Sequence, residues 1–216
     1  SQDKAASPEA FLGWADKVAH DRYVVQYKMD GASLELQYTH GRLRHGVTRG
    51  DGTIGDDITA NVRRMQGALP RIDPAFTGAV RGEVVMSHAV HAAKYSDKAN
   101  CRNAANGLMK RKDGLGSADL LIIVYDALHA ENEAFFNDEL SKLRWLAAQG
   151  FTVVEYRVVE TPEEVVAYRE KTMTQRAELD FDIDGIVVKG CSIDLADARR
   201  PRPEKQIAFK FNPDEA

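Results

Sequence analysis

The sequence of 216 residues has little cysteine and no metal-binding pattern. Its two cysteines, Cys101 and Cys191, do not form a C-x-x-C pair, so the spacing favours neither a zinc knuckle nor a disulfide framework and is typical of a reducing, cytoplasmic setting. Five histidines show no metal-ligand spacing with acidic partners, and we expect core or surface roles for them: His40, His45, His88, His91 and His129.

Long apolar runs are also missing. No segment approaches the roughly 20 apolar residues that a membrane-spanning helix needs. The first residues lack the basic stretch followed by an apolar stretch that marks a secretory signal. We therefore expect a cytoplasmic protein that does not contact a membrane.

A basic excess is absent as well. The 33 acidic side chains outnumber the 29 lysines and arginines, and the formal net charge is -4. Dedicated nucleic-acid-binding domains usually carry a positive excess that displaces counterions from phosphates. Any contact with DNA is therefore expected to come from a local basic surface or from further domains.

Hydrophobic periodicity predicts intermixed helices and strands. Helical spacing of apolar residues predicts helices at residues 8–18, 59–65, 104–110, 138–149 and 161–176, the last with a T-x-x-E capping box. Apolar runs between turn residues predict strands at residues 23–29, 33–38, 42–48, 79–86, 120–127, 152–159, 183–188 and 206–211. Because no regular βαβ repeat occurs, we expect the α+β class, with antiparallel sheets flanked by helices in a single domain.

A lysine with the features of a nucleophile stands at the end of the first predicted strand. Lys28 is followed by Asp30 and Gly31 in a K-x-D-G pattern. An amine attacks phosphorus only in its neutral form, which nearby cations and desolvation favour, and Lys189 and Lys210 could supply the cations. K-x-D-G alone occurs often by chance at strand-to-turn junctions, so its weight depends on partners elsewhere in the chain.

Those partners follow in a fixed order. Arg81-Gly82-Glu83 lies in the predicted strand at residues 79–86, and Tyr125 lies in an apolar strand. Two further lysines stand in residues 184–189, DGIVVK, and residues 208–211, AFKF. Together with Lys28 they resemble the covalent nucleotidyltransferase superfamily of DNA ligases, RNA ligases and mRNA capping enzymes. The resemblance implies an ATP-grasp-like nucleotidyltransferase fold in which Lys28 accepts AMP.

Longer blocks narrow the family. Residues 48–63, TRGDGTIGDDITANVR, resemble the TRGDGxxGEDVTxNVR signature of NAD-dependent bacterial DNA ligases. Residues 100–107, NCRNAANG, resemble their NPRNAAAG block, and residues 181–185, FDIDG, match their FDxDG. The resemblance covers residues 23–211. It implies a DNA ligase adenylation domain that takes AMP from NAD onto Lys28 for transfer to the 5′-phosphate of a nick.

The resemblance also implies roles for individual residues. Four are expected to be catalytic: Lys28, Asp30, Lys189 and Lys210. The adenylate donor is expected to contact Gln26, Tyr27, Gly31, Arg49, Glu83, Tyr125, Lys189 and Lys210, with the base stacked on Tyr125 and the ribose held by Glu83. Three residues correspond to the DNA-phosphate surface: Arg102, Lys110 and Arg176. Glu83 and Asp184 are the expected Mg²⁺ ligands.

Some residues depart from the family pattern. Gln26 stands where the family usually has a glutamate that contacts the adenine amino group, although an amide oxygen can still accept that hydrogen bond. Cys101 replaces a proline, and Lys110 replaces an arginine. Simpler roles also stay open, because Tyr125 could bury its ring in the core and Arg102 and Lys110 could form a solvated helix face.

The family usually has further domains. A helical module that binds the nicotinamide mononucleotide half of NAD would precede Ser1, and oligonucleotide-binding, zinc-finger, helix-hairpin-helix and BRCT regions would follow Ala216. We expect residues 1–216 to be the nucleotidyltransferase domain alone, and a monomer. Two alternatives stay open, an ATP-dependent DNA or RNA ligase core and a non-catalytic DNA-binding domain with the same fold. We expect nicked double-stranded DNA as the partner, weak salt-sensitive binding, and poor sealing by this chain alone.

Overall fold

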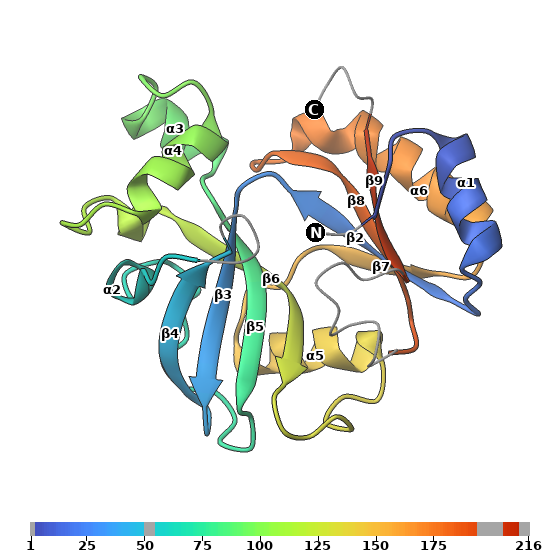
Figure 1. The fold of residues 1–216 in the computed structure, drawn as a ribbon. Coiled ribbons are helices and arrows are strands. Elements are labelled where there is room, and N and C mark those ends of the chain that lie inside the picture. Colours follow the sequence, from blue (N-terminus) through green and yellow to red (C-terminus); the bar gives the residue numbers. More distant parts are fainter. Residues whose placement is uncertain (1–2, 50–54, 194–204, 212–216) are drawn as a thin grey trace.

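Two β-sheets with helices around them make up the fold (Figure 1). The computed structural model describes residues 3–49, 55–193 and 205–211. Sheet A has the strand order β1-β9-β8-β2-β7 and contains β1 (Asp3–Ala5), β2 (Tyr23–Met29), β7 (Tyr156–Val159), β8 (Ile183–Gly190) and β9 (Gln206–Lys210). Sheet B has the order β4-β3-β5-β6 and contains β3 (Ala32–Thr39), β4 (Arg42–Thr48), β5 (Gly78–Val85) and β6 (Leu121–His129).

One face of sheet A is covered by two helices, α1 (Pro8–Lys17) and α6 (Pro162–Gln175). Alternate residues of β2 and β8 point to this face, where Val25 and Ile186 pack against Phe11 of α1 and Val165 of α6. The ring of Phe11 lies edge-on to that of Phe209, with centroids 4.9 Å apart. The sheet is antiparallel except for β1, which pairs with β9 in parallel.

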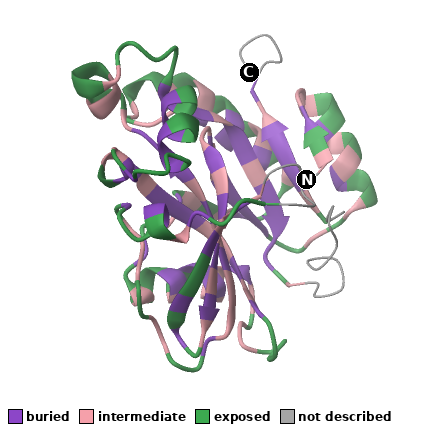
Figure 2. Cartoon of the chain, turned by 60° about the vertical axis from the view of Figure 1, so that its left-hand side comes forward, coloured by how far each residue is buried: buried purple, intermediate pink, exposed green. Residues whose placement is uncertain are grey.

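Sheet B carries the larger core. Leu34, Val80 and Ile122 lie on its inner face with the apolar side chains of α4 (Cys101–Met109) and α5 (Glu139–Gln149). The shorter elements are α2 (Thr59–Val62), α3 (His88–Lys94), η1 (Ser117–Asp119) and η2 (Arg176–Glu178). Figure 2 shows the consequence, because burial follows the strands while the outer faces of the helices are exposed.

The structure confirms the predicted α+β class and most of the predicted elements. The predicted cap of α6 is present, since the Thr161 hydroxyl accepts a hydrogen bond from the Glu164 amide, while the Glu164 carboxylate accepts one from the amide of Glu160 rather than of Thr161. Across the described ranges, no helix is long and apolar enough to cross a membrane.

Several element boundaries were predicted wrongly. Residues 152–159 form a strand only from Tyr156, where pairing with β2 begins. Helix α4 begins at Cys101 rather than at residue 104, because the Asn100 side chain caps it by accepting from the Asn103 amide. Helix α2 ends at Val62. Helix α3 was not predicted because none of its residues is buried, and β1 is defined only by its distant pairing with β9.

The chain crosses from sheet A to sheet B between β2 and β3, at Asp30 and Gly31. A Cβ atom at Gly31 would lie 2.3 Å from the Val84 carbonyl oxygen, so a side chain there would push the β2–β3 connection away from β5. The glycine of the K-x-D-G pattern therefore permits this connection to lie close to β5. This places Lys28 beside the crossing point of the two sheets.

Gly185 permits a second close approach, and its replacement tests it. A Cβ atom at Gly185 would lie 2.6 Å from the Phe209 carbonyl oxygen, which is backbone and cannot rotate away. We expect Gly185→Ala to lower the free energy of unfolding by about 2 kcal/mol or more. The exposed helical Gly107, around which an added Cβ would meet no heavy atom within 4 Å, is the matched control, and Gly107→Ala should stabilise α4 by about 0.5 to 1 kcal/mol. Urea unfolding of both variants measures this, and equal changes would contradict the steric argument.

Candidate active site

The register of sheet A brings four predicted site residues to one face. Lys28 on β2 lies opposite Gly185 on β8, and Gly185 lies opposite Lys210 on β9. Residues directly opposite each other point to the same face of a sheet, and so do residues two apart along a strand. Gln26, paired with Val187, and Lys189, paired with Val24, therefore share the face of Lys28.

The carboxylate of Asp184 connects two of the lysines. The Nζ atom of Lys28 lies 3.2 Å from both carboxylate oxygens, and Nζ of Lys210 lies 3.9 Å from one of them. All three side chains are partly buried, so their charges are less screened than at an open surface. The predicted lysine pair thus meets around one negative group.

Glu83 faces this group from sheet B. It lies opposite Ser33, whose hydroxyl donates a 2.8 Å hydrogen bond to Oε1 of Glu83. Burial raises the pKa of Glu83 from its usual 4.5 to about 7, while the Ser33 hydrogen bond and the charge of Lys28 act in the opposite direction. Burial likewise raises the pKa of Asp30. The carboxylates around Lys28 are therefore partly desolvated.

Tyr125 occupies the junction between the sheets. Its carbonyl oxygen accepts a 3.2 Å hydrogen bond from Nε2 of Gln26, and its hydroxyl accepts one of 3.4 Å from Arg49. The ring packs on the apolar cluster beneath it, and Nζ of Lys189 lies 5.9 Å from the ring centroid. Burial raises the pKa of Tyr125 to about 12, so the hydroxyl stays protonated at neutral pH. The structure thus joins the expected base-stacking residue to Arg49, Gln26 and Lys189.

A buried ion network supports Lys189 and was missed by the sequence reasoning. Nζ of Lys189 lies 3.9 Å from one oxygen of Asp126, and Nζ of Lys142 lies 2.8 Å from the other and 3.1 Å from Glu139. Burial alone would lower the pKa of Lys142, but the carboxylates of Asp126 and Glu139 raise it above its usual range. Burial would raise the pKa of Asp126, but the two lysines hold it well below its usual range. Both groups are therefore charged at neutral pH.

Tyr27 was expected to contact the adenylate donor, but the structure does not place it beside the other expected contact residues. It points to the opposite face of β2 from Lys28, where its ring stacks on Tyr168 of α6 with centroids 6.5 Å apart. Strand alternation explains this, because neighbours in a strand point to opposite faces.

The guanidinium of Arg176, a residue expected at the DNA surface, lies over the ring of Phe211, 5.2 Å from its centroid.

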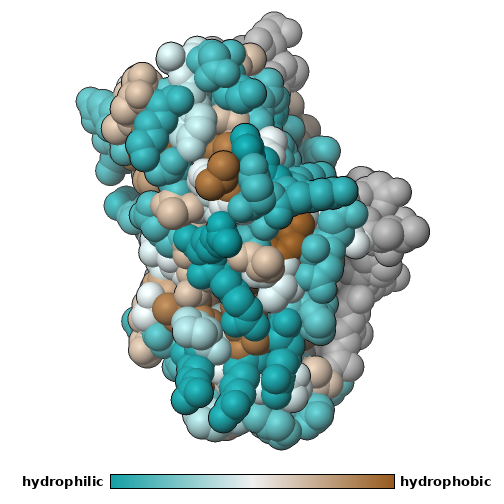
Figure 3. All heavy atoms as spheres, turned by 90° about the vertical axis from the view of Figure 1, so that its left-hand side faces the viewer, coloured by the Kyte–Doolittle hydropathy of each residue, from teal (hydrophilic) through white to brown (hydrophobic). Residues whose placement is uncertain are grey.

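Two of the residues expected at DNA lie on or just after α4. Arg102 near its start donates a 3.2 Å hydrogen bond to Asp30, whereas Nζ of Lys110 at its end lies 4.0 Å from Asp56. About half of each side chain is exposed. Figure 3 views the molecule from the side of α3 and α4, where hydrophilic side chains predominate and hydrophobic ones form only small patches. Residues 50–54 of the glycine-rich block lie outside the described residues.

The expected Mg²⁺ ligands fit the ion only in part. Glu83 and Asp184 belong to no group of three metal-ligating side chains in the part of the chain that the structure describes. Mg²⁺ commonly takes one or two carboxylates and fills its other positions with water and substrate phosphates. Glu83 and Asp184 act on one another electrostatically, and a site of that kind would use one or both of these carboxylates.

Known proteins resemble this chain over its whole length. Residues 1–214 match the family model of the NAD-dependent DNA ligase adenylation domain. The chain is 49% identical to the DNA ligase of Treponema denticola over 100% of this chain and 36% of that protein. It is 47% identical to the DNA ligase of Treponema pallidum over 100% of this chain and 28% of that protein. The chain thus spans about a third of the length of these curated relatives.

Solved structures show the same fold at low identity. An archaeal ATP-dependent RNA ligase aligns with a TM-score of 0.60 and 14% identity, over 98% of this chain and 47% of that chain. Mycobacterial DNA ligase D complexed with ATP and MES aligns with a TM-score of 0.53 and 14% identity, over 97% of this chain and 58% of that chain. These likenesses confirm the predicted nucleotidyltransferase fold.

The raised pKa of Glu83 predicts a pH-dependent stability. Between its usual pKa of 4.5 and about 7, the folded protein retains a proton that the unfolded chain releases, so the free energy of unfolding falls as pH rises through this window. Glu83→Gln removes the titration. The variant should therefore gain stability relative to wild type from about pH 5 to about pH 7, by on the order of 2 kcal/mol, and no more above that.

Urea unfolding at a series of pH values measures this difference. The exposed Glu131 provides the control, and Glu131→Gln should follow the wild-type pH dependence closely. A Glu83→Gln curve that stays parallel to wild type would show that Glu83 does not titrate in this window.

The buried network around Lys142 predicts a large loss of stability. Lys142→Met leaves the carboxylates of Asp126 and Glu139 without their shared cation, and we expect a cost of about 3 to 5 kcal/mol. The ion pair of Lys94 with Asp119 is the matched control because the Lys94 side chain is 60% exposed, and Lys94→Met should cost less than about 1 kcal/mol. Thermal and urea unfolding compare the two. Similar losses for both variants would refute the proposed importance of burial.

Proposed function

Because the chain belongs to the family of NAD-dependent DNA ligase adenylation domains, we propose that it transfers AMP from NAD to its own Lys28. The observation that carries the proposal is the alignment of Lys28 and Lys210 on either side of Gly185, with Asp184 between their ammonium groups. Attack on an adenylyl phosphate needs a nucleophilic amine and, close beside it, a cation that binds the phosphate.

The nucleoside of the donor is bound by residues of both sheets. Adenine stacks on the ring of Tyr125, a contact worth roughly 1 to 3 kcal/mol. Because Nε2 of Gln26 already donates to the Tyr125 carbonyl, the amide oxygen is the group that Gln26 offers to the adenine amino group. Glu83 accepts from the ribose hydroxyls, and Arg49, which already contacts the Tyr125 hydroxyl, borders the same nucleoside.

The covalent step exchanges one bond to phosphorus for another. Nζ of Lys28 attacks the adenylyl phosphorus, a P–N bond forms, and the P–O bond to nicotinamide mononucleotide breaks. The amine loses a proton, which the Asp184 carboxylate at 3.2 Å can accept. Lys210 and Lys189 stabilise the negative charge on the phosphate oxygens, and Asp30 orients the end of the strand. When bound, Mg²⁺ on Glu83 and Asp184 would neutralise further phosphate charge.

The adenylated lysine then activates a nicked double-stranded DNA. We propose that Arg102, Lys110 and Arg176 contact its phosphates, and that the protein acts as a monomer in the cytoplasm. The cytoplasmic location is supported by the two cysteines, which are buried and unbridged, as in a reducing compartment. The phosphate contacts are supported by the side chains of Arg102 and Lys110, which are about half exposed.

Intact-mass analysis tests the adenylation. Wild type, Lys28→Ala and Lys28→Arg are each incubated with Mg²⁺ and either NAD or ATP, and Lys94→Ala serves as the control outside the site. We expect NAD to add the mass of one adenylate to wild type and Lys94→Ala and to neither Lys28 variant, because arginine keeps the charge but does not act as the nucleophile.

Each other outcome has a defined meaning. Labelling by ATP alone would favour an ATP-dependent ligase core. Labelling that persists in Lys28→Ala would place the adenylate on another residue and overturn the assignment of the nucleophile. No labelling with either donor would leave two explanations, a requirement for the helical module that binds the nicotinamide mononucleotide half of NAD or a non-catalytic domain. Adding that module in trans separates the two, and no label even then would overturn self-adenylation.

A further inference from the structure

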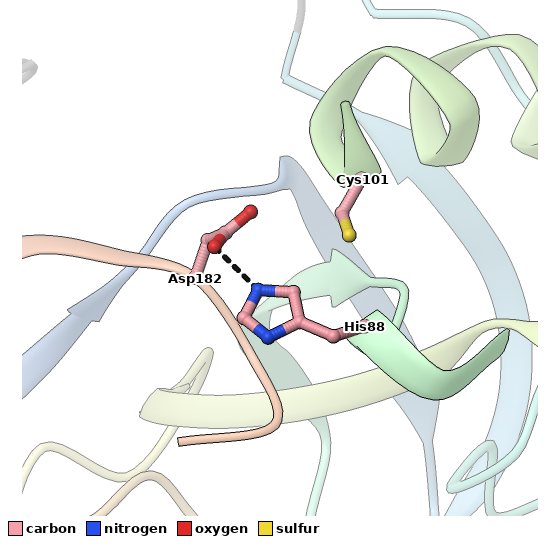
Figure 4. Close-up of side chains that lie close together, drawn as sticks. All are labelled: His88, Cys101 and Asp182. Atoms are coloured by element: carbon pink, nitrogen blue, oxygen red, sulfur yellow. Dashed lines mark hydrogen bonds and ion pairs between the residues drawn. The ribbon is translucent and has the colours of Figure 1, made fainter. Parts of the chain in front are cut away.

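Three potential metal ligands converge beside the active site from separate parts of the chain. His88 begins α3, Cys101 begins α4, and Asp182 lies just before β8. Their ligand atoms all lie within 4.8 Å of one another, and Nε2 of His88 lies 2.6 Å from Oδ1 of Asp182. Figure 4 shows the three side chains pointing toward one another. The spacing of the histidines along the sequence gave no sign of this cluster.

The backbone that carries these side chains is held in place by its own hydrogen bonds. The amide of His88 donates to the Asp180 carbonyl at 2.8 Å, which fixes the start of α3 against the segment before β8. The Asp182 carbonyl accepts from the Asp30 amide at 3.0 Å. Cys101 is the first residue of a helix capped by Asn100. Binding a metal would therefore require only side-chain adjustment, which keeps the entropic cost low.

The donor set selects the class of metal. Imidazole nitrogen and thiolate sulfur suit Zn²⁺ and similar transition-metal ions, whereas Mg²⁺ and Ca²⁺ prefer oxygen ligands. Tetrahedral Zn²⁺, with bonds of about 2.0 to 2.3 Å, places its ligand atoms about 3.3 to 3.7 Å apart. Small rotations of the exposed His88 and half-buried Asp182 side chains are sufficient to reach this spacing from the present one.

The local charge favours a cation. Asp30 and Asp180 add two acidic residues beside Asp182, since the Asp30 amide donates to the Asp182 carbonyl and the Asp180 carbonyl accepts from the His88 amide. The same negative field attracts a divalent ion, which displaces the thiol proton when it binds. Three protein ligands leave the fourth tetrahedral position for water or another ligand.

We propose that His88, Cys101 and Asp182 form a binding site for a thiophilic divalent transition-metal ion of the Zn²⁺ type. The bound ion ties α3 and α4, which pack on sheet B, to the segment that leads into β8 of sheet A. It lies near the nucleotide site but is separate from the Mg²⁺ position, since it uses neither Glu83 nor Asp184.

Cobalt binding to the metal-free 216-residue chain tests the site. Co²⁺ substitutes for Zn²⁺ and gives a thiolate charge-transfer absorption only when a cysteine sulfur is bound. We expect one Co²⁺ per chain with this absorption, displaced by Zn²⁺ and unaffected by a large excess of Mg²⁺. Cys101→Ser and His88→Ala should each weaken binding by more than the roughly 10- to 100-fold that the loss of an outer-shell partner costs.

Two control variants match these changes. Cys191→Ser removes the other buried cysteine, and His45→Ala removes a histidine that pairs with Asp57 without a cysteine nearby. Both should bind Co²⁺ as wild type does. Because the His88 side chain is exposed, its variant should keep the fold, which circular dichroism checks. Wild type without the thiolate absorption, or an absorption that survives Cys101→Ser, would overturn the site and leave only a His88–Asp182 ion pair.

Discussion

The carboxylate of Asp184 holds together the charged groups on which the active site depends. Without it, Lys28 and Lys210 would present two like charges across a single glycine. At partly buried positions, opposite charges about 3 to 4 Å apart attract by several kcal/mol before desolvation is subtracted. Asp184 thus keeps both lysines in place.

The two sheets are joined by polar contacts as well as by apolar packing. Gln26 of sheet A donates to the Tyr125 carbonyl of sheet B, and Lys189 of sheet A faces Asp126 of sheet B. These contacts set the distance between the lysines on one sheet and the ring of Tyr125 on the other. Lys142 belongs to the same arrangement, since its ammonium group lies 2.8 Å from the other carboxylate oxygen of Asp126.

Much of this arrangement could be predicted from the sequence, because short motifs follow one another in a fixed order along the chain and carry the family resemblance. Lys28, Glu83 and Tyr125 were assigned from such signals, and the structure brings them to one junction. Tyr27 shows a limit of motif transfer, since the alternation of β2 itself predicts that it points away from Lys28. Lys142 was assigned no role from the sequence, because nothing in its neighbourhood along the chain indicates Asp126 as a partner.

The cluster of His88, Cys101 and Asp182 shows the same limit more strongly. Metal motifs are recognised when their ligands are close in sequence, but these ligands come from three elements that meet only in the folded chain. Cys101 occupies a position where related ligases usually have proline. A proline at the first turn of a helix stabilises its start, whereas cysteine there adds a donor atom instead. The substitution is therefore chemically significant only because α3 and the segment before β8 bring His88 and Asp182 to it.

An exposed ion pair can exchange its partners at little cost in free energy, whereas a buried ion pair cannot. Arg102 is 47% exposed where it meets Asp30, and such a pair contributes about 0 to 1 kcal/mol. Lys189 is only 6% exposed beside Asp126, so breaking that pair would leave a buried charge. If Arg102 binds a DNA phosphate as proposed, its release from Asp30 costs little and frees a carboxylate next to Lys28. DNA binding would then alter the charge around the nucleophile, while the Lys189 network stays fixed.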